Sequence, residues 1–342
     1  MSRSTNICIK LGALGILGLL VSCSPRVATS FWKIGTPADS TRAGYTVIHA
    51  EGKTRHCYPI KEWAADPAVD TYHQLHHHGV AVESELMAYR IYFDKKQTID
   101  PYCKRTPQLE LAQSHWYPND SLLAAGYGDD ILRVSGTVGV GSVKYWNGQK
   151  MVHIEPVAER SQRIAQQTRT SATIEVAVNG WQPSPNTQNS PNTPINLSVQ
   201  YTLRAGHRDM RCDVSLNEAV EGLCTGVQTI PAKGGRDTAT IILPNGVLLA
   251  SWGTDWPVND SAKYAKETVG LGVFIPKAYA GALVHDKQNN LCLLNTLPFR
   301  EGPGVGCHFY LICCGATKEN HPVATNATEW LIYLRRWAKN LR

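Results

Sequence analysis

The chain has 342 residues, and its 34 lysines and arginines exceed its 28 aspartates and glutamates, giving a formal net charge of +6. This surplus is small and no segment is rich in lysine and arginine, which excludes a nucleic-acid footprint and favours small acidic ligands. The sequence has no G-x-S-x-G elbow, phosphate-binding glycine loop or dinucleotide fingerprint, so we expect no nucleotide partner.

The N-terminus has the form of a lipoprotein signal peptide. Arg3 and Lys10 precede the apolar run Leu11–Val21, and Leu20-Val21-Ser22-Cys23 reads as a lipobox. A helix of this length rises roughly 16 Å, about half of a ~30 Å hydrocarbon core, which disfavours a membrane-spanning helix. We therefore predict lipidation of Cys23. An ordinary signal peptide with an incidental cysteine is the alternative.

This interpretation divides the chain into three parts. Residues 1–22 form the signal peptide, residues 23–43 a lipidated tether, and residues 44–342 a single β-sandwich domain. No acidic pair follows Cys23, which favours a periplasm-facing anchor, in the outer membrane, over export to the cell surface. The lipid is then the only predicted contact with a membrane.

Short segments with the character of strands recur along the domain. Apolar and polar residues alternate in them, β-branched and aromatic residues are frequent, and Gly, Pro, Asn or Asp separate them. Helical patterns are too sparse to cover both faces of a parallel sheet. We predict a mostly-β fold, a large two-sheet antiparallel β-sandwich with few helices. Typical segments are LMAYRIYF, ATIEVAV, INLSVQYTLR, MRCDVSL and VGLGVFIP.

Two helices are predicted. In the C-terminal segment Asn326 is a candidate N-cap with Glu329 three residues later, and Trp330, Leu334, Trp337 and Leu341 form one apolar stripe. We expect this amphipathic helix to pack on a sheet. A shorter helix can begin at Asp120 and end at Gly126.

The cysteines do not form a recognisable disulfide framework. An exported protein can form disulfides, and Cys57 and Cys103 are the pair we expect. Others, such as Cys292 and Cys307, lie in apolar segments where a cysteine behaves as a small hydrophobic residue.

The segment from Tyr72 to Asp94 gathers several proton-carrying side chains. If residues 82–93 form one strand, Glu83, Glu85 and Tyr89 share one face and Arg90 lies on the other. Two adjacent carboxylates repel, so one should titrate high or have a cationic partner. An imidazole, with a pKa of about 6.5, can act as acid or base near neutral pH.

Three interpretations of this segment remain open. The first is acid–base catalysis by His77, His78, Glu83, Glu85, Tyr89, Arg90 and Tyr127. The second is a divalent metal held by His76, His78 and Glu83, because the H-x-H-x4-E spacing resembles the first signature of cupin barrels. The third is a polar network without chemistry. We expect no tightly bound metal or other cofactor.

Further polar residues are candidates for substrate binding. Arginine can donate two parallel hydrogen bonds to a carboxylate, and tryptophan can stack on a sugar ring. His153, Glu155 and the pair Asp129-Asp130 add polar groups near turns. The predicted binding residues are His115, Trp116, Arg160, Arg163 and His207.

Several longer strings resemble a known family. HHHGVAVESELMAYRIYFDKKQTID, WYPNDSLLAAGYGDDIL, QYTLRAGHRD and CTGVQ, behind the lipobox, are similar to lipoproteins of the domain-of-unknown-function family 4861 from Gram-negative polysaccharide degraders. The resemblance covers roughly residue 44 to the C-terminus. It implies a mutarotase-like sandwich and a role in degrading acidic glycans, as a lyase or dehydratase on uronate-containing oligosaccharides. Pro101 and Cys103 depart from the expected strand end.

The functional hypothesis is therefore β-elimination on a uronic acid. Arg90 or Arg160 neutralises the carboxylate, His77 or His78 removes the C5 proton, and a tyrosine, Tyr89 or Tyr127, protonates the leaving oxygen. The alternatives are a non-catalytic lipid-anchored glycan-binding protein, a mutarotase or epimerase, and a cupin-like metal-dependent sugar enzyme.

Overall fold

The computed structural model describes residues 26–50, 53–114, 118–183, 193–231, 237–259, 261–262, 264–299, 302–315, 319 and 321–341. Within these residues the fold is mostly β, and the strands form four sheets. The predicted β-sandwich is confirmed, but its second layer consists of two separate sheets.

One layer is a ten-stranded antiparallel sheet. Its order is β17-β18-β19-β23-β15-β14-β13-β12-β5, and β22 pairs with β23. The strands are β5 (Glu62–Ala65), β12 (Glu159–Gln167), β13 (Ser171–Trp181), β14 (Ile195–Arg204), β15 (Asp209–Leu216), β17 (Asp237–Leu243), β18 (Gly246–Asp255), β19 (Glu267–Pro276), β22 (Leu297–Pro298) and β23 (Val305–Gly315).

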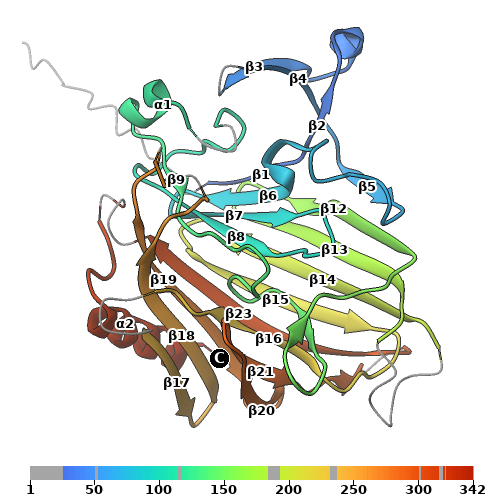
Figure 1. Ribbon diagram of the computed structural model, residues 1–342, viewed down its shortest axis with the longest axis vertical. Helices are drawn as coiled ribbons and strands as arrows, with labels where there is room; N and C mark the ends of the chain where they lie inside the picture. Colours follow the sequence, from blue (N-terminus) through green and yellow to red (C-terminus); the bar gives the residue numbers. More distant parts are fainter. Residues whose placement is uncertain are drawn as a thin grey trace, which may run out of the picture.

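The other layer consists of two five-stranded sheets. The first, of order β1-β6-β7-β8-β9, has strands β1 (Val27–Ser30), β6 (Gly79–Ser84), β7 (Met87–Tyr92), β8 (Ile99–Cys103) and β9 (Asp129–Asp130). The second, of order β11-β10-β16-β21-β20, has strands β10 (Lys144–Trp146), β11 (Met151–Val152), β16 (Leu223–Gln228), β20 (Ala280–His285) and β21 (Asn289–Leu294). Figure 1 shows β6, β7 and β8 lying across the large sheet.

The main hydrophobic core lies between these layers. Val82 and Tyr89 from the first small sheet and Leu223 from the second belong to one buried cluster with Val176 and Val199 of the large sheet. The alternating polar residues of β14 and β15 point away from this cluster, as the period-two pattern predicts. Burial of this apolar surface is the main stabilisation of the sandwich.

The first strands of the domain lie nearer the N-terminus than the sequence indicated. Residues 23–43 were predicted as a tether, but β1 pairs with β6 and Phe31 is buried in the core. β2 (Trp32–Gly35) joins β4 (Lys53–Pro59) and β3 (Thr46–Ala50) in a small sheet, and η1 (Pro37–Thr41), a 3-10 helix, follows β2. The segment from Val27 to Gly35 therefore belongs to the folded domain, because β1 and β2 complete the edges of two sheets.

Both predicted helices are present. α2 (Ala327–Asn340) has Asn326 as N-cap, and its buried Trp330 and Leu334 pack on the outer face of the large sheet. A Cβ on Gly270 would lie 2.6 Å from the Trp330 ring, so the helix needs a glycine there. α1 (Asp120–Ala124) is capped by Asn119, one residue before the predicted start. Among the described residues no helix combines the length and apolar character needed to cross a membrane.

Two sequence predictions are corrected here. Residues 82–93 are not one strand, because Ser84 Oγ accepts hydrogen bonds from the amides of Leu86 and Met87 and turns the chain between β6 and β7. Cys57 and Cys103 do not form a disulfide. Both are buried and lie on strands of different sheets.

Candidate functional site

The histidine run splits between two environments. His76–His78 forms a 3-10 turn, η2, in which His77 and His78 have positive φ angles of 59° and 60°. The imidazoles of His76 and His77 are buried and stacked, with their Nε2 atoms 2.8 Å and 2.7 Å from the carbonyl oxygens of Ser114 and Leu111. These two residues hold the segment 104–114 against the sheet. The prediction of His77 as a catalytic base has no support in this geometry.

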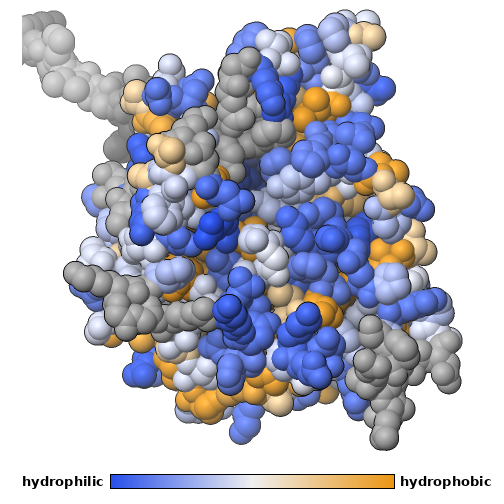
Figure 2. All heavy atoms as spheres, in the orientation of Figure 1, coloured by the Kyte–Doolittle hydropathy of each residue, from blue (hydrophilic) through white to orange (hydrophobic). Residues whose placement is uncertain are grey.

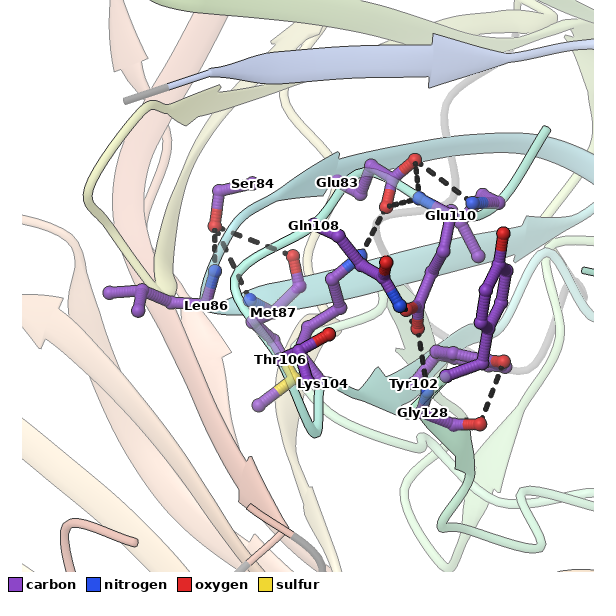
Figure 3. A network of polar contacts seen from close by, with 12 residues as sticks. Glu83, Ser84, Leu86, Met87, Tyr102, Lys104, Thr106, Gln108, Glu110 and Gly128 are labelled. Atoms are coloured by element: carbon purple, nitrogen blue, oxygen red, sulfur yellow. Dashed lines mark hydrogen bonds and ion pairs between the residues drawn. The ribbon is translucent and has the colours of Figure 1, made fainter. Parts of the chain in front are cut away.

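Glu83 anchors the same segment from β6. Its carboxylate accepts hydrogen bonds from the Lys104 ammonium group, from the Glu110 amide at 2.9 Å and from the Leu111 amide at 2.9 Å. Figure 3 shows the Lys104 side chain directed at Glu83, with the Glu110 carboxylate nearby. Burial raises the pKa of Glu110 to about 7. Lys104 is thus the cationic partner that the sequence analysis expected for one of the two glutamates. Both carboxylate oxygens of Glu83 accept hydrogen bonds within the protein.

The alternative metal set is not assembled. His76 Nε2 and the Glu83 oxygens are engaged as described, and His78 Nδ1 lies 3.1 Å from the Tyr72 carbonyl oxygen. Within the described part of the chain, no group of three or more His, Cys, Asp and Glu side chains is arranged to hold a metal ion.

The turn after Ser84 also changes which residues share a face. The register places Ala81 opposite Arg90 and Arg90 opposite Asp100, so Glu83 shares the outer face with Arg90. Tyr89 points instead into the core, where its hydroxyl donates to the Arg208 carbonyl oxygen. The expected common face of Glu83, Glu85 and Tyr89 is therefore wrong.

Arg90 is the centre of a buried ionic cluster. Its Nη2 atom lies 2.6 Å from Oδ2 of Asp100 and 2.6 Å from Oδ2 of Asp130, and all three side chains are almost fully buried. The Tyr92 hydroxyl donates to Asp100 Oδ2 at 2.6 Å. Burial raises the pKa of both carboxyls, and the proximity of Asp100 raises that of Asp130 further. Arg90 is thus occupied by two acids and is not a free clamp for substrate.

The remaining predicted residues lie apart from one another. Glu85 is in the β6–β7 turn beside the β14–β15 turn, where His207 is exposed and pairs with Asp209 at 3.0 Å. Tyr127 donates from its hydroxyl to Gln113 Oε1 at 3.2 Å. His115, Trp116 and Cys23 lie outside the described residues.

The two predicted arginines differ in burial. Arg163 is about half exposed and pairs with Glu175 at 2.6 Å on the outer side of β12. Arg160 is buried, donates to the Ile154 carbonyl oxygen at 3.1 Å and lies 3.3 Å from Glu155. Of the two, Arg160 lines a hollow of the surface.

Three adjoining hollows lie around the loops that follow β5, β7, β9 and β11. The basic hollow, of about 500 Å³, is lined by residues that include Tyr72, Tyr92, Lys95, Lys96, Asp130, Arg133 and His153. The loop hollow, of about 490 Å³, is lined by residues 65–73, by Phe93–Lys96, and by Glu155 and Arg160. The hairpin hollow, of about 620 Å³, is lined by Gly136, Asn147, Lys150–His153, Glu155 and Asp286–Asn289.

Aromatic rings and cations meet in the basic hollow. The Lys96 ammonium group lies 5.3 Å from the ring centroids of both Tyr72 and Tyr92. His78 stacks on Tyr72 from another side, at a centroid separation of 3.8 Å. Buried Lys144 donates to the Lys96 carbonyl oxygen and fixes the loop that carries Lys95 and Lys96. Figure 2 shows that hydrophilic residues cover most of this view of the molecule.

Two titratable groups of the basic hollow have strongly shifted pKa values. Burial, reinforced by Lys144 and Lys96, lowers the pKa of His153 to about 3, so its imidazole is neutral at physiological pH. Burial raises the pKa of Tyr72 to about 12, so its phenol keeps its proton there. The hollow therefore offers a neutral nitrogen base, a phenolic acid and several cations.

Sequence reasoning missed most of this hollow. Tyr72 and Tyr92 lie within the segment from Tyr72 to Asp94 and Lys96 just after it, but no motif or spacing in the sequence marks them as members of one site. Asp100 lies in β8, whose residues are all buried, and a buried acid requires a partner, which here is Arg90. Arg133 and His153 come from distant segments, and only the fold brings them together.

Comparison with known proteins supports the resemblance seen in the sequence. Residues 37–342 match the family described as a domain of unknown function, DUF4861. No curated protein and no solved structure matches the chain. Because the match covers most of the chain and nearly all of the sandwich, the protein belongs to the DUF4861 family.

Proposed function

We propose that the protein binds acidic oligosaccharides in the basic hollow and acts on a uronate residue by β-elimination. The observation that carries this proposal is the lining of one hollow by three cations, Lys95, Lys96 and Arg133, together with the neutral base His153. The phenol of Tyr72 lines the same hollow.

The cations of the basic hollow can neutralise the substrate carboxylate, which is the first requirement of β-elimination. The C5 proton of a uronate is too weakly acidic for an imidazole while the neighbouring carboxylate keeps its full charge. Lys96 and Arg133 can donate hydrogen bonds to that carboxylate and stabilise the enolate that develops from it. A preorganised donor of this kind is worth on the order of 3 kcal/mol. Lys96 and Arg133 thus take the role of neutralising the carboxylate, for which the sequence had suggested Arg90 or Arg160.

His153 is the proposed base. Its pKa in the free protein is lowered by burial and by nearby cations, including Lys144 and Lys96. A bound carboxylate places a negative charge beside those cations, which raises the pKa of the imidazole and makes it a stronger base. Substrate binding thus prepares the group that accepts the C5 proton.

Tyr72 is the proposed acid. As His153 takes the C5 proton, the C4=C5 double bond forms, the C4–O bond breaks, and the Tyr72 hydroxyl gives its proton to the leaving oxygen. Water returns a proton to the tyrosinate afterwards and removes one from His153. If the leaving oxygen carries a sugar the reaction is a lyase cleavage, and if it carries only hydrogen the reaction is a dehydration.

The test is an incubation of the mature chain with a panel of uronate oligosaccharides. Absorbance of the conjugated alkene reports elimination, and mass spectrometry distinguishes cleavage from loss of water. We expect His153→Ala and Tyr72→Phe to lower the rate at least a hundredfold. The matched control is His49→Ala, because His49 is an exposed histidine on β3.

The same experiment separates the alternatives. Binding of acidic sugars without alkene or mass change in any form would leave a glycan-binding protein. Interconversion of free sugar ends without alkene would indicate a mutarotase or epimerase. Wild-type rates in both His153→Ala and Tyr72→Phe would refute the assigned roles.

The proposed location rests on the lipobox alone. We propose that acylated Cys23 tethers the domain to the periplasmic face of the outer membrane. Since β1 begins at Val27, only a few residues would separate the lipid from the sheet. Mass spectrometry of the N-terminal peptide from membrane fractions tests this, and an unmodified N-terminus would refute it.

A further inference from the structure

The three hollows differ in charge, although they adjoin. In the basic hollow the cations Lys95, Lys96 and Arg133 face one carboxyl group, Asp130. That carboxyl is paired with the buried Arg90 at 2.6 Å, and burial raises its pKa. Arg133 also pairs with Asp255 at 3.0 Å and Lys96 with Asp94 at 3.2 Å, both acids outside the lining, and with Lys95 the lining keeps a positive surplus.

The loop hollow has the opposite balance. Four acidic side chains line it against three cations, Lys95, Lys96 and Arg160. Asp94 lies 3.2 Å from Lys96, and Glu155 lies 3.3 Å from Arg160. The other two, Asp66 and Asp70, belong to the loop after β5, and Asp70 lies 2.9 Å from the imidazole of His73. An anionic sugar in this hollow would meet like charge, whereas hydroxyl groups of a neutral sugar can donate hydrogen bonds to these carboxylates.

The hairpin hollow is balanced. Lys150 and Lys287 line it together with Glu155 and Asp286. Asp286 already accepts hydrogen bonds from the Met151 amide at 3.1 Å and the Asn289 side chain at 2.9 Å. This hollow offers donors and acceptors in similar number and no surplus charge for an anion.

Shared residues connect the hollows to one another. Tyr72, Lys95 and Lys96 line both the basic and the loop hollow, while Gly136 and His153 line both the basic and the hairpin hollow. Accepting the proposed function, we infer that the site selects an oligosaccharide in which one uronate, seated in the basic hollow, is flanked by neutral sugars. Chains of consecutive uronates are disfavoured by the acids of the loop hollow.

The test measures affinity rather than turnover. Isothermal titration of the His153→Ala protein, which keeps the three cations, compares three trisaccharides of equal length: one with a central uronate between neutral sugars, one of three uronates, and one wholly neutral. We expect the mixed trisaccharide to bind at least tenfold more tightly than either of the others. Equal or tighter binding of the tri-uronate overturns the inference.

A double variant tests whether the acids of the loop hollow cause the selectivity against consecutive uronates. Asp66→Asn with Asp70→Asn keeps the shape of the loop hollow and removes two negative charges. We expect the tri-uronate to gain about three- to tenfold in affinity and the mixed trisaccharide to change by less than twofold. Lys339→Gln on α2 controls for net charge and should alter neither affinity.

The outcomes for the two proposals are distinguishable. A mixed trisaccharide that binds no better than the tri-uronate refutes the selectivity and leaves elimination untouched. If no acidic trisaccharide binds, both proposals fall. If binding follows the expected order but the wild-type protein makes no alkene, the selectivity stands and the elimination does not.

Discussion

The imidazole of His78 stacks face to face on the phenol of Tyr72, with ring centroids 3.8 Å apart and an angle of 6° between the planes. Burial lowers the pKa of His78 to about 3, and its Nδ1 atom lies 3.1 Å from the Tyr72 carbonyl oxygen. Because Tyr72, and not His78, lines the basic hollow, we interpret this histidine as the support that orients the proposed acid.

The first prediction follows from that stack. His78→Phe keeps an aromatic ring behind Tyr72, whereas His78→Ala removes it, so turnover should persist within about threefold in the first variant and fall about tenfold or more in the second. The lost stacking should also lower the free energy of unfolding by about 0.5–1.5 kcal/mol in His78→Ala. Alkene formation and urea unfolding measure the two effects. A His78→Phe protein as inactive as His153→Ala would restore His78 as the base.

The second prediction compares two arginines. Arg90→Met leaves Asp100 and Asp130 buried without their cation, which should lower the free energy of unfolding by about 3–5 kcal/mol at pH 7. Arg163→Met breaks a half-exposed pair with Glu175 and should cost about 0–1 kcal/mol. Urea denaturation of both variants measures the difference. Similar losses would show that the buried cluster does not depend on Arg90.

The third prediction concerns the pH dependence of stability. The pKa of Glu110 in the folded protein is raised by burial from its ordinary 4.5 to about 7, so the folded state binds this proton more tightly than the unfolded state. The resulting stabilisation is complete below pH 4.5 and is lost as the pH rises to about 7. Glu110→Gln should remove this slope.

Urea titrations at several pH values between 4 and 8 provide the measurement. Glu62→Gln, an exposed substitution on β5, is the control and should follow the wild-type curve. A Glu110→Gln protein with the wild-type slope between pH 4.5 and 7 would assign the slope to other groups.

The fourth prediction uses the pKa of His153. The base must be neutral, and with a pKa of about 3 it is neutral over the whole range above pH 4. The acid limb of kcat/KM, which reports the free protein, should therefore lie near pH 3 rather than near 6.5. The acid limb of kcat should lie higher, because bound uronate offsets the nearby cations. A kcat/KM limb near pH 6.5 would indicate an ordinary exposed histidine as the base.

The sequence by itself determined the class of the fold. Alternating segments such as those of β14 and β15 indicate strands with one buried face, and the cap at Asn326 with the stripe through Trp330 and Leu334 indicates α2. These signals are local, because a strand or an amphipathic helix repeats every few residues whatever its partner. The family resemblance was likewise visible in contiguous strings.

Tertiary structure decided which residues meet. The two-residue turn at Glu85 and Leu86 reverses the chain and puts Glu83 on the same face of the sheet as Arg90. In one continuous strand these two residues would lie on opposite faces, and the alternation of residues in the sequence does not show where the chain turns. Pairing across sheets sent His76, His77 and Glu83 to hold segment 104–114, while Tyr72, Lys96, Arg133 and His153 met from four separate loops. Contacts between distant segments depend on register and packing, which are properties of the whole chain, and so the charged hollow could be found only in the folded protein.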